Sequence, residues 1–238
     1  MTRFDLHVHT ALSACAENTM SPCRIIARAH GAGLGMVGIT DHNASANVRP
    51  TLEQGRRYGI CVVPGVEMTS REEAHVLVLF DRIETLDEWQ QVIDDNLPAA
   101  ANVPDIFGDQ VVYSCDDEIV ALDERLRQVG VNMGLSRVVE AVHERGGVVI
   151  PSHVFRNRHS LTSQLGLIDA DAGYDALETR WRDWQQQDRH VGDCAYGYPV
   201  ITGSDAHFLE DVGRVVLEVC DDVTTVSRLL ASLRKASA

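Results

Sequence analysis

Short apolar runs alternate with longer amphipathic stretches along the chain. The apolar runs, which predict β-strands, cover residues 4–9, 36–40, 61–66, 75–80, 147–152, 176–179, 200–203 and 214–219. The stretches that predict helices cover residues 22–32, 51–58, 86–96, 117–129, 136–145 and 224–234. Because strands and helices alternate, the pattern predicts parallel βα units.

Histidines and carboxylates lie at the ends of these predicted strands. His7 and His9 are two residues apart, so they point to the same face of their strand, and the same spacing separates Asp205 from His207. The other members of this set are His42, Glu67, His75 and His153. Imidazole and carboxylate groups are the usual ligands of zinc, manganese and iron. The pattern therefore indicates a metal site.

The distribution of these side chains over several strand ends also favours a closed barrel over an open sheet. Side chains from the ends of several different strands converge only if the strands surround a common axis. We therefore predict an α/β, TIM-like barrel with the metal site at the C-terminal ends of its strands. Residues 1–238 are predicted to form one domain, in which residues 94–135 are an insertion over the site that restricts what can enter.

Composition and charge narrow the classes of protein further. The chain has 238 residues and a hydrophobic fraction of 45%, enough for one domain with a sizeable core. Its net charge of -14 disfavours broad attraction to nucleic acid polymers and anionic membranes. No apolar run approaches the roughly 20 residues needed to span a bilayer, and no signal-peptide pattern opens the sequence. The six cysteines form no C-x-x-C pair, so we expect reduced thiols and a cytoplasmic protein.

Six short motifs carry a resemblance to a known family. They are DLHVHT at residues 5–10, TDHN at 40–43, PGVE at 64–67, HVL at 75–77, PSH at 151–153 and GSDAH at 203–207. In this order they resemble the polymerase and histidinol phosphatase (PHP) domain superfamily, and within it the short, stand-alone bacterial proteins. A lone HxH motif would be a weak signal, whereas the ordered set spans nearly the whole chain.

The resemblance implies a distorted (βα)7 barrel that holds two or three divalent metal ions, zinc, manganese or iron. It also implies phosphoester hydrolysis by a hydroxide that bridges two of the metals. The implied ligands fall into three sets: His7, His9, Glu67 and Asp205; Glu67, His75 and His153; and His42 with His207. The implied catalytic residues are Glu67, Asp205, His207 and Arg156.

One position departs from the family pattern. The family usually supplies a further ligand, histidine or aspartate, one or two residues after the serine that matches Ser13, where this chain has Ala14 and Cys15. Cys15 could bind the third metal as a thiolate, which would favour zinc over manganese. Alternatively Glu17 reaches the site, the third site is weak, or Cys15 is a small buried residue. Asp41 is expected to orient an imidazole rather than to bind metal.

Arginine is the side chain best suited to bind a substrate phosphate, because its guanidinium can contact two oxygens at once. Arg156 lies three residues after His153, and Arg158 and Arg180 are the other candidates. The alternative is that these residues belong to a surface rich in arginine. The remaining histidines, without motif support, are expected at the surface or behind the ligands: His30, His143, His159 and His190.

Three functions are compatible with these residues. The first is hydrolysis of a small phosphomonoester, either histidinol-phosphate-like or nucleotide-like, with a small phosphorylated metabolite as the partner. The second is an amidohydrolase, which also uses an HxH motif and a late aspartate. The subtype with a carbamylated lysine is excluded because the one lysine, Lys235, lies outside any strand end. The third is a PHP module that binds metal without catalysis.

Overall fold

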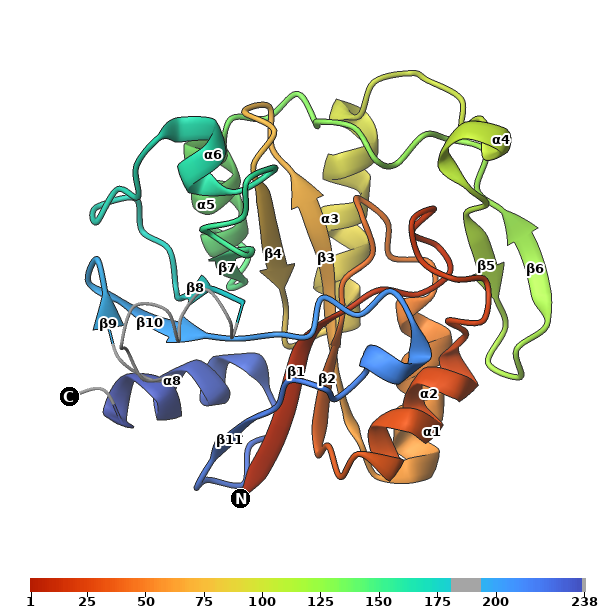
Figure 1. The fold of residues 1–238 in the computed structure, drawn as a ribbon, viewed down its shortest axis with the longest axis horizontal. Helices are drawn as coiled ribbons and strands as arrows, with labels where there is room; N and C mark the ends of the chain where they lie inside the picture. Colours follow the sequence, from red (N-terminus) through yellow and green to blue (C-terminus); the bar gives the residue numbers. More distant parts are fainter. Residues whose placement is uncertain (181–193, 237–238) are drawn as a thin grey trace.

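A six-stranded sheet forms the framework of the molecule (Figure 1). The computed structural model describes residues 1–180 and 194–236. The strands of this sheet, in the order β11-β1-β2-β3-β4-β7, are Leu217–Val219, Thr2–Val8, Met36–Ile39, Cys61–Thr69, His75–Leu79 and Val148–Pro151. A smaller sheet has the order β8-β10-β9, with bounds Leu177–Glu178, Tyr198–Ile201 and Cys194–Ala195.

Only part of the large sheet is parallel. β1, β2 and β3 run in the same direction, whereas β4 is antiparallel to both β3 and β7, and β11 is antiparallel to β1. The prediction of parallel βα units is therefore wrong for β4 and β11. Residues 70–74 alone connect β3 to β4, and a parallel crossover needs a dozen or more residues.

The reversal of β4 changes where His75 enters the site. His75 is the first residue of β4 and pairs with Thr69, the last residue of β3. It therefore lies at the same rim as Glu67, although the prediction that it sits at a C-terminal strand end is wrong. At this rim, His75 is therefore contributed by the N-terminal end of an antiparallel strand.

Hydrogen bonds between distant segments close the sheet into a distorted barrel. The Asp175 amide donates to the Val149 carbonyl at 2.9 Å, which joins the segment before β8 to β7, and β8 pairs with β10. Beyond β10, the Ala206 carbonyl accepts from the His9 amide at 3.0 Å, which returns the chain to β1. The ring thus consists of β1, β2, β3, β4, β7, β8 and β10. The predicted fold class, an α/β barrel, is confirmed.

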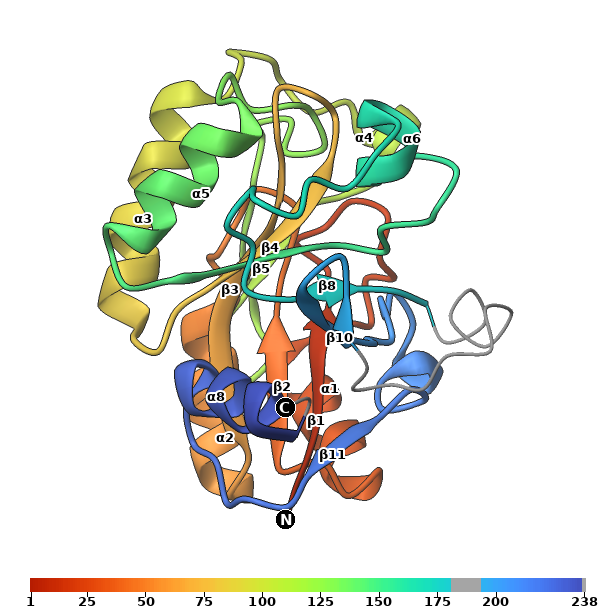
Figure 2. The ribbon, with the colours of Figure 1, turned by 90° about the vertical axis from the view of Figure 1, so that its left-hand side faces the viewer.

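Helices cover the outside and one end of this ring. They are α1 Pro22–Gly31, α2 Val48–Tyr58, α3 Ile83–Asn96, α5 Leu135–His143, α6 Leu161–Leu165 and α8 Val226–Ala236. α3 and α5 lie side by side, and α8 lies close to the N-terminus of the chain, where β1 begins (Figures 1 and 2). Across the described ranges, no helix combines the length and apolar character needed to cross a bilayer.

Two apolar layers hold the strands in place. One side of the strands packs against α1, α2, α3 and α5. On the other side, Leu229 and Leu233 of α8 belong to the same apolar cluster as Phe4 and Leu6 of β1. Gly38 of β2 lets β1 approach closely, because a Cβ atom there would lie 2.3 Å from the Leu6 carbonyl oxygen. The strand ends that carry polar side chains are thereby fixed relative to one another.

The insertion differs from its predicted structure. In place of the predicted helix at 117–129, the chain forms a hairpin of β5 Val111–Tyr113 and β6 Ile119–Leu122, followed by an irregular segment. Asp117 has a φ of 62° in the connecting turn, a conformation that no helix tolerates, and the β-branched Ile119 and Val120 favour a strand. The short helix α4, Pro104–Phe107, lies above this hairpin (Figure 1).

Candidate metal centre

Glu67 is the centre of the site. It lies on β3 with only 1% of its surface exposed, and its two carboxylate oxygens face the ring nitrogens of five histidines. The distances are 3.4 Å to His7 Nε2, 3.4 Å to His9 Nε2, 3.2 Å to His42 Nδ1, 3.2 Å to His75 Nδ1 and 3.2 Å to His153 Nε2. One buried carboxylate therefore touches side chains from five separate positions in the chain.

Asp205 is the second carboxylate of the centre. Its Oδ1 atom lies 3.4 Å from His7 Nε2 and 3.3 Å from His9 Nε2. The backbone explains this contact, because the Ala206 amide donates to the carbonyl of His7 on β1, and the Ala206 carbonyl accepts from the amide of His9 just beyond β1. An isolated bridge between Val8 and Ala206 thus holds the two motifs together, although residues 205–207 do not form the predicted strand. Nδ1 of His207 lies 3.6 Å from Asp205 Oδ1.

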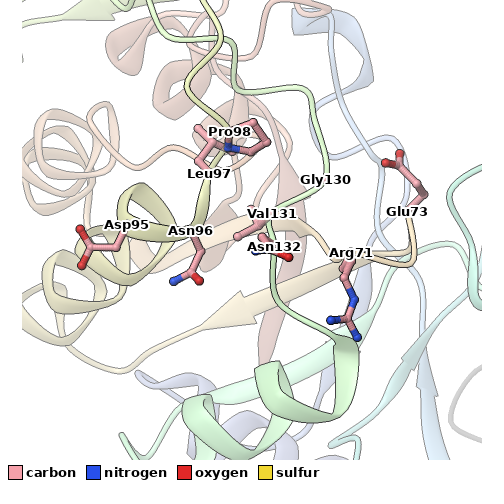
Figure 3. A pocket seen from close by; sticks show the side chains of 9 residues that line it. All are labelled: Arg71, Glu73, Asp95, Asn96, Leu97, Pro98, Gly130, Val131 and Asn132. Atoms are coloured by element: carbon pink, nitrogen blue, oxygen red, sulfur yellow. The ribbon is translucent and has the colours of Figure 1, made fainter.

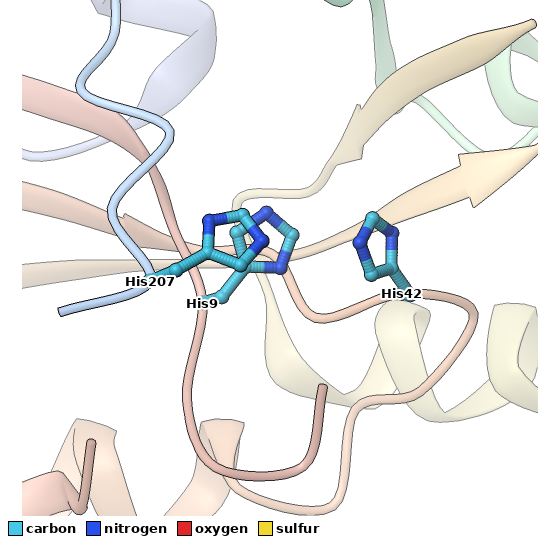
Figure 4. Close-up of side chains that lie close together, drawn as sticks. All are labelled: His9, His42 and His207. Carbon is cyan, nitrogen blue, oxygen red and sulfur yellow. The ribbon is translucent and has the colours of Figure 1, made fainter. Parts of the chain in front are cut away.

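The potential ligand atoms form three sets, and within each set all of the atoms lie within 4.8 Å of one another. The sets are His7, His9, Glu67 and Asp205; His42, Glu67 and His75; and His9, His42 and His207. Figure 4 shows the rings of the third set grouped together. The first set coincides with one predicted from the sequence. His153 falls outside these sets among the described residues, although it contacts Glu67, and Cys15 belongs to none of them.

Several buried polar atoms in the centre have no hydrogen-bond partner. They include both carboxylate oxygens of Glu67, Nδ1 of His75, and both ring nitrogens of His153. Buried polar groups are normally paired, because an unpaired one costs about 1–3 kcal/mol. A divalent cation is the partner that carboxylate oxygens and neutral imidazoles share. The residues present therefore fit a metal centre with several ions.

Charge in the centre also favours a cation. Burial lowers the pKa of His9 to about 4 and holds that of His42 well below its usual range, so both rings are neutral at pH 7. Burial opposes protonation of His7, but Glu178, Glu67 and Asp205 together hold its pKa well above its usual range. Neutral imidazoles are the form that binds metal, and three carboxylates around one ring supply the negative field.

Glu178 supports the centre and was not predicted from the sequence. It is buried at the end of β8, where its two oxygens lie 3.0 and 2.9 Å from Nδ1 of His7, and it accepts the His153 amide at 3.1 Å. Because Nδ1 donates to this carboxylate, Nε2 is the nitrogen of His7 that faces Glu67 and Asp205, and a metal would bind there by displacing its proton. The available signal was its place at a strand end, two residues before the arginine that was singled out.

Replacement of Glu178 with glutamine is expected to lower metal affinity or activity by about tenfold to a hundredfold. The amide keeps the shape but supplies only one acceptor oxygen for His7 and the His153 amide. Metal titration of the purified variant measures this effect, with Glu218→Gln on the exposed face of β11 as the control. Equal metal affinity in Glu178→Gln and the parent would show that the contact does not orient His7.

Asp41 acts on His9 through Ser13. Asp41 accepts hydrogen bonds from the Ser13 hydroxyl and the Thr10 amide, both at 2.7 Å, and the Ser13 oxygen lies 3.0 Å from Nδ1 of His9. Since the hydroxyl donates to Asp41, its oxygen accepts from Nδ1 of His9, which leaves Nε2 free to face the carboxylates. This chain of contacts fixes the orientation of one ring.

A cavity of about 220 Å³ opens onto the centre. Its lining combines ligand candidates with other side chains: His42, Glu67, His75, Asp205, His207, Cys15, Thr69, Glu73, Gln128, Arg156 and His159. Arg156 contacts Asp205, with Nη1 3.3 Å from Oδ2. Arg158 and Arg180 are exposed, and neither is among the described residues that line the cavity.

His159 lies closer to the centre than the sequence suggested. Its ring stacks on that of His75 with centroids 4.7 Å apart, and its carbonyl accepts the His75 amide at 2.9 Å. No sequence motif surrounds His159. Its position beside His75 becomes visible only in the structure, where the loop between β7 and α6 carries it to the centre. His190, another histidine without motif support, lies outside the described residues.

A larger pocket of about 530 Å³ lies along the end of α3 (Figure 3). Its lining includes Arg71, Asn96 and Asn132, and it shares Glu73 with the cavity at the centre. The described lining holds none of the predicted ligands, so we place the functional site at the smaller cavity, where the unpaired ligand atoms are.

Cys15 lines the cavity but is not a member of the described ligand sets. Loss of solvation in the cavity, together with the charges of Glu67 and Asp205, raises the pKa of its thiol to about 12. The thiol is therefore protonated at pH 7, and a metal would have to displace the proton.

The hypothesis that the Cys15 thiolate binds the third metal leads to a specific prediction. If Cys15 completes the third site, Cys15→Ser lowers the affinity of one metal by about tenfold or more, and Cys15→His or Cys15→Asp keeps it. Competition titrations with a coloured chelator measure the affinity, and Cys220→Ser, at another exposed cysteine, is the control. Unchanged metal binding in Cys15→Ser would show that the residue only packs.

A buried histidine–carboxylate centre at the rim of an α/β barrel defines a class of metal-binding proteins. The sequence comparison agrees: residues 5–123 match the PHP domain, and residues 195–238 match the PHP-associated region. The chain belongs to the PHP domain family, and the resemblance inferred from its motifs is confirmed.

Known proteins similar to this chain include a nuclease of known sequence and two solved structures. The 5′-3′ exoribonuclease Rnm of Escherichia coli (strain K12) is 34% identical over 74 residues, 30% of this chain and 24% of that protein. The lesion-specific endonuclease PfuEndoQ from Pyrococcus furiosus is 17% identical with a TM-score of 0.67, over 98% of this chain and 56% of that chain. A Bifidobacterium adolescentis protein assigned as a metal-dependent phosphoesterase is 17% identical with a TM-score of 0.57, over 99% and 96%. The two structural likenesses show the fold alone.

Proposed function

We propose that this protein is a metal-dependent phosphoric ester hydrolase that acts on a small phosphomonoester. The observation that carries the proposal is the unpaired, buried carboxylate of Glu67 among five imidazoles. The proposed ligands are the predicted ones: His7, His9, Glu67 and Asp205; Glu67, His75 and His153; and His42 with His207. Two or three zinc, manganese or iron ions would occupy them.

The bound metals would polarise the phosphoryl oxygens, lower the pKa of a water molecule and neutralise charge during the displacement. The protein's own residues prepare this chemistry. Nδ1 of His207 lies 2.8 Å from the Asp205 carbonyl oxygen, which can only accept, so Nδ1 carries the proton and Nε2 offers its lone pair. Asp205 and His207 both line the cavity, where they can contact the reacting phosphate.

The size of the cavity supports a small substrate. The cavity, at about 220 Å³, is smaller than the roughly 300–1,000 Å³ of typical ligand pockets, so it admits a phosphoryl group and a small alcohol. A histidinol-phosphate-like or nucleotide-like ester fits this description. The names of Rnm and PfuEndoQ show that some similar proteins act on nucleic acids, and the end of a polymer presents the same phosphoryl group.

The test is a screen of the metal-loaded protein for phosphate or alcohol release. Sugar phosphates, nucleotides, amino-alcohol phosphates, phosphodiesters, 5′-phosphorylated RNA and lesion-containing DNA form the panel. Faster release from small monoesters than from any polymer supports the proposal. Preference for RNA or DNA would overturn the proposed substrate, and no release from any ester would favour an amidohydrolase or a non-catalytic metal module.

Arg156 is the proposed phosphate-binding side chain. Arg156→Ala is expected to lower kcat/KM by about 2–4 kcal/mol equivalent, because it removes one partner of a charge pair in the cavity. Its side chain is 43% exposed, which places the effect toward the lower end of that range. Steady-state kinetics measure it. Arg158→Ala is the matched control, since Arg158 lies two residues away but outside the cavity lining, and an equal loss in both variants would contradict the assignment.

A further inference from the structure

The insertion places one neutral amide in the cavity. Gln128 is half-buried and lines the cavity beside Cys15. It belongs to the irregular segment after β6, which is not part of the barrel. A side chain from an added segment reaches the catalytic cavity only if its backbone is held there.

Asn43 fixes the backbone on both sides of Gln128. Its Nδ2 atom donates to the carbonyl oxygens of Arg127 at 2.7 Å and Val129 at 2.9 Å, on either side of Gln128. Asn43 is itself fixed, because its amide donates to the Glu67 carbonyl at 3.0 Å and its Oδ1 accepts the Thr69 amide at 3.1 Å. Its φ of 49° is a left-handed conformation that asparagine tolerates better than most residues.

Arg127 anchors the same segment from the other side. Its guanidinium donates to Asp123 at 2.7 Å, to Asp94, and to the Asn43 carbonyl at 3.3 Å. Asp94 belongs to α3, so the segment is tied both to a helix and to the strand that carries Glu67. The backbone of Gln128 is therefore held by residues that are not ligand candidates.

We propose that Gln128 determines substrate specificity by hydrogen-bonding a neutral polar group on the alcohol part of the phosphoester, and that Asn43 positions it. The group would be a hydroxyl, an amide or a ring nitrogen, because a carboxamide offers two donors and one acceptor without charge. In the proposed function, the ligand candidates in the lining hold the metals and Arg156 binds the phosphate. The other lining residues are Cys15, Thr69, Glu73, His159 and Gln128, and Gln128 is the carboxamide among them. This proposal rests on the proposed phosphoesterase function.

The experiment compares esters that differ in their alcohol. Phenyl phosphate, whose alcohol has no further polar group, is the reference against glycerol 1-phosphate, histidinol phosphate and adenosine 5′-monophosphate. Gln128→Ala is expected to lower kcat/KM about tenfold for the polar ester that the parent prefers, and less than about twofold for phenyl phosphate. Gln128→Asn restores part of the preference, and Gln91→Ala on the exposed side of α3 changes neither rate. A uniform loss for all esters, or no loss, would overturn the proposal.

Asn43→Asp tests the positioning role. The carboxylate still accepts the Thr69 amide but cannot donate to the two carbonyls beside Gln128. We expect the same loss of preference as in Gln128→Ala, and no further loss in the double variant. Losses of preference that add in the double variant would show that Asn43 does not act through Gln128.

A binding measurement separates this proposal from the phosphoesterase function. Calorimetry of the metal-loaded protein with inorganic phosphate and with the same esters requires no turnover. Gln128→Ala should lower the affinity for the polar ester about tenfold and leave the affinity for inorganic phosphate unchanged. If the parent hydrolyses no ester, the proposed function fails while this binding result still decides the role of Gln128. Equal affinities in parent and variant would overturn the proposed role.

Discussion

Replacement of Glu67 with glutamine is expected to reduce phosphoesterase activity by at least about a thousandfold, which corresponds to roughly 4 kcal/mol of transition-state stabilisation. The carboxylate oxygens are the shared neighbours of five imidazoles, and an amide offers one weak acceptor in place of two charged oxygens. Metal occupancy should fall with activity. Kinetics and elemental analysis of the same preparation measure both.

The Glu67 variant needs a control for folding and one for charge. Circular dichroism and thermal unfolding of metal-free parent and variant should coincide, because the amide preserves the shape of the side chain. Glu88→Gln, at an exposed position of α3, removes the same charge without an effect on turnover. Near-normal turnover in Glu67→Gln would show that Glu67 is not a shared ligand.

Removal of the metals should have the second large effect. A strong chelator is expected to abolish activity, and manganese or zinc should restore it. Bound metals stabilise the folded state by about 4 kcal/mol when their concentration is a thousandfold above Kd, so the unfolding midpoint should drop by about 10 °C on removal. The unpaired atoms of Glu67, His75 and His153 give the physical reason, because they lose their only partners.

Elemental analysis completes this prediction. The reconstituted protein should contain two to three ions per chain, which follows from the three sets of converging ligand atoms. A chelator-treated protein that keeps its activity, or less than one equivalent of each metal after reconstitution, would contradict the metal-centre model. The exposed mixed groups of the larger pocket beside α3 should not bind these ions.

Parts of the fold could be read from local sequence. The runs that became β1, β2, β3, β4 and β7 are apolar and short, and their periodicity depends on neighbouring residues only. The insertion was predicted as a segment, but its helix at 117–129 was wrong. Its conformation depends on a turn at Asp117 and on bonds to distant groups such as Asn43 and Asp94, which no local window contains.

The candidate site divides in the same way. Strand alternation correctly predicts that His7 and His9 point to the same side. The same expectation is wrong for Asp205 and His207, because β10 ends at Ile201 and Asp205 has a φ of 51°, which is not an extended conformation. The order of the motifs identified the other ligand candidates. Glu178, His159 and Gln128 carry no motif. Each reaches the centre through a long-range contact: with His7, with His75 and with the Asn43-held segment, respectively. Sequence separation hides such contacts, because they exist only after the barrel has closed.

The sequence by itself determined most of the strand pattern and the order of the ligand candidates, because side-chain alternation and apolar periodicity are set by residues a few positions apart. It also predicted the barrel, because ligand candidates at the ends of several strands converge only around a common axis. Only the tertiary structure decided that β4 runs antiparallel and delivers His75 from its first residue. It also decided that Arg156, and not Arg158 or Arg180, lines the cavity. The physical reason is that strand direction and cavity lining depend on which distant backbone groups hydrogen-bond, and those partners are chosen by packing of the whole chain.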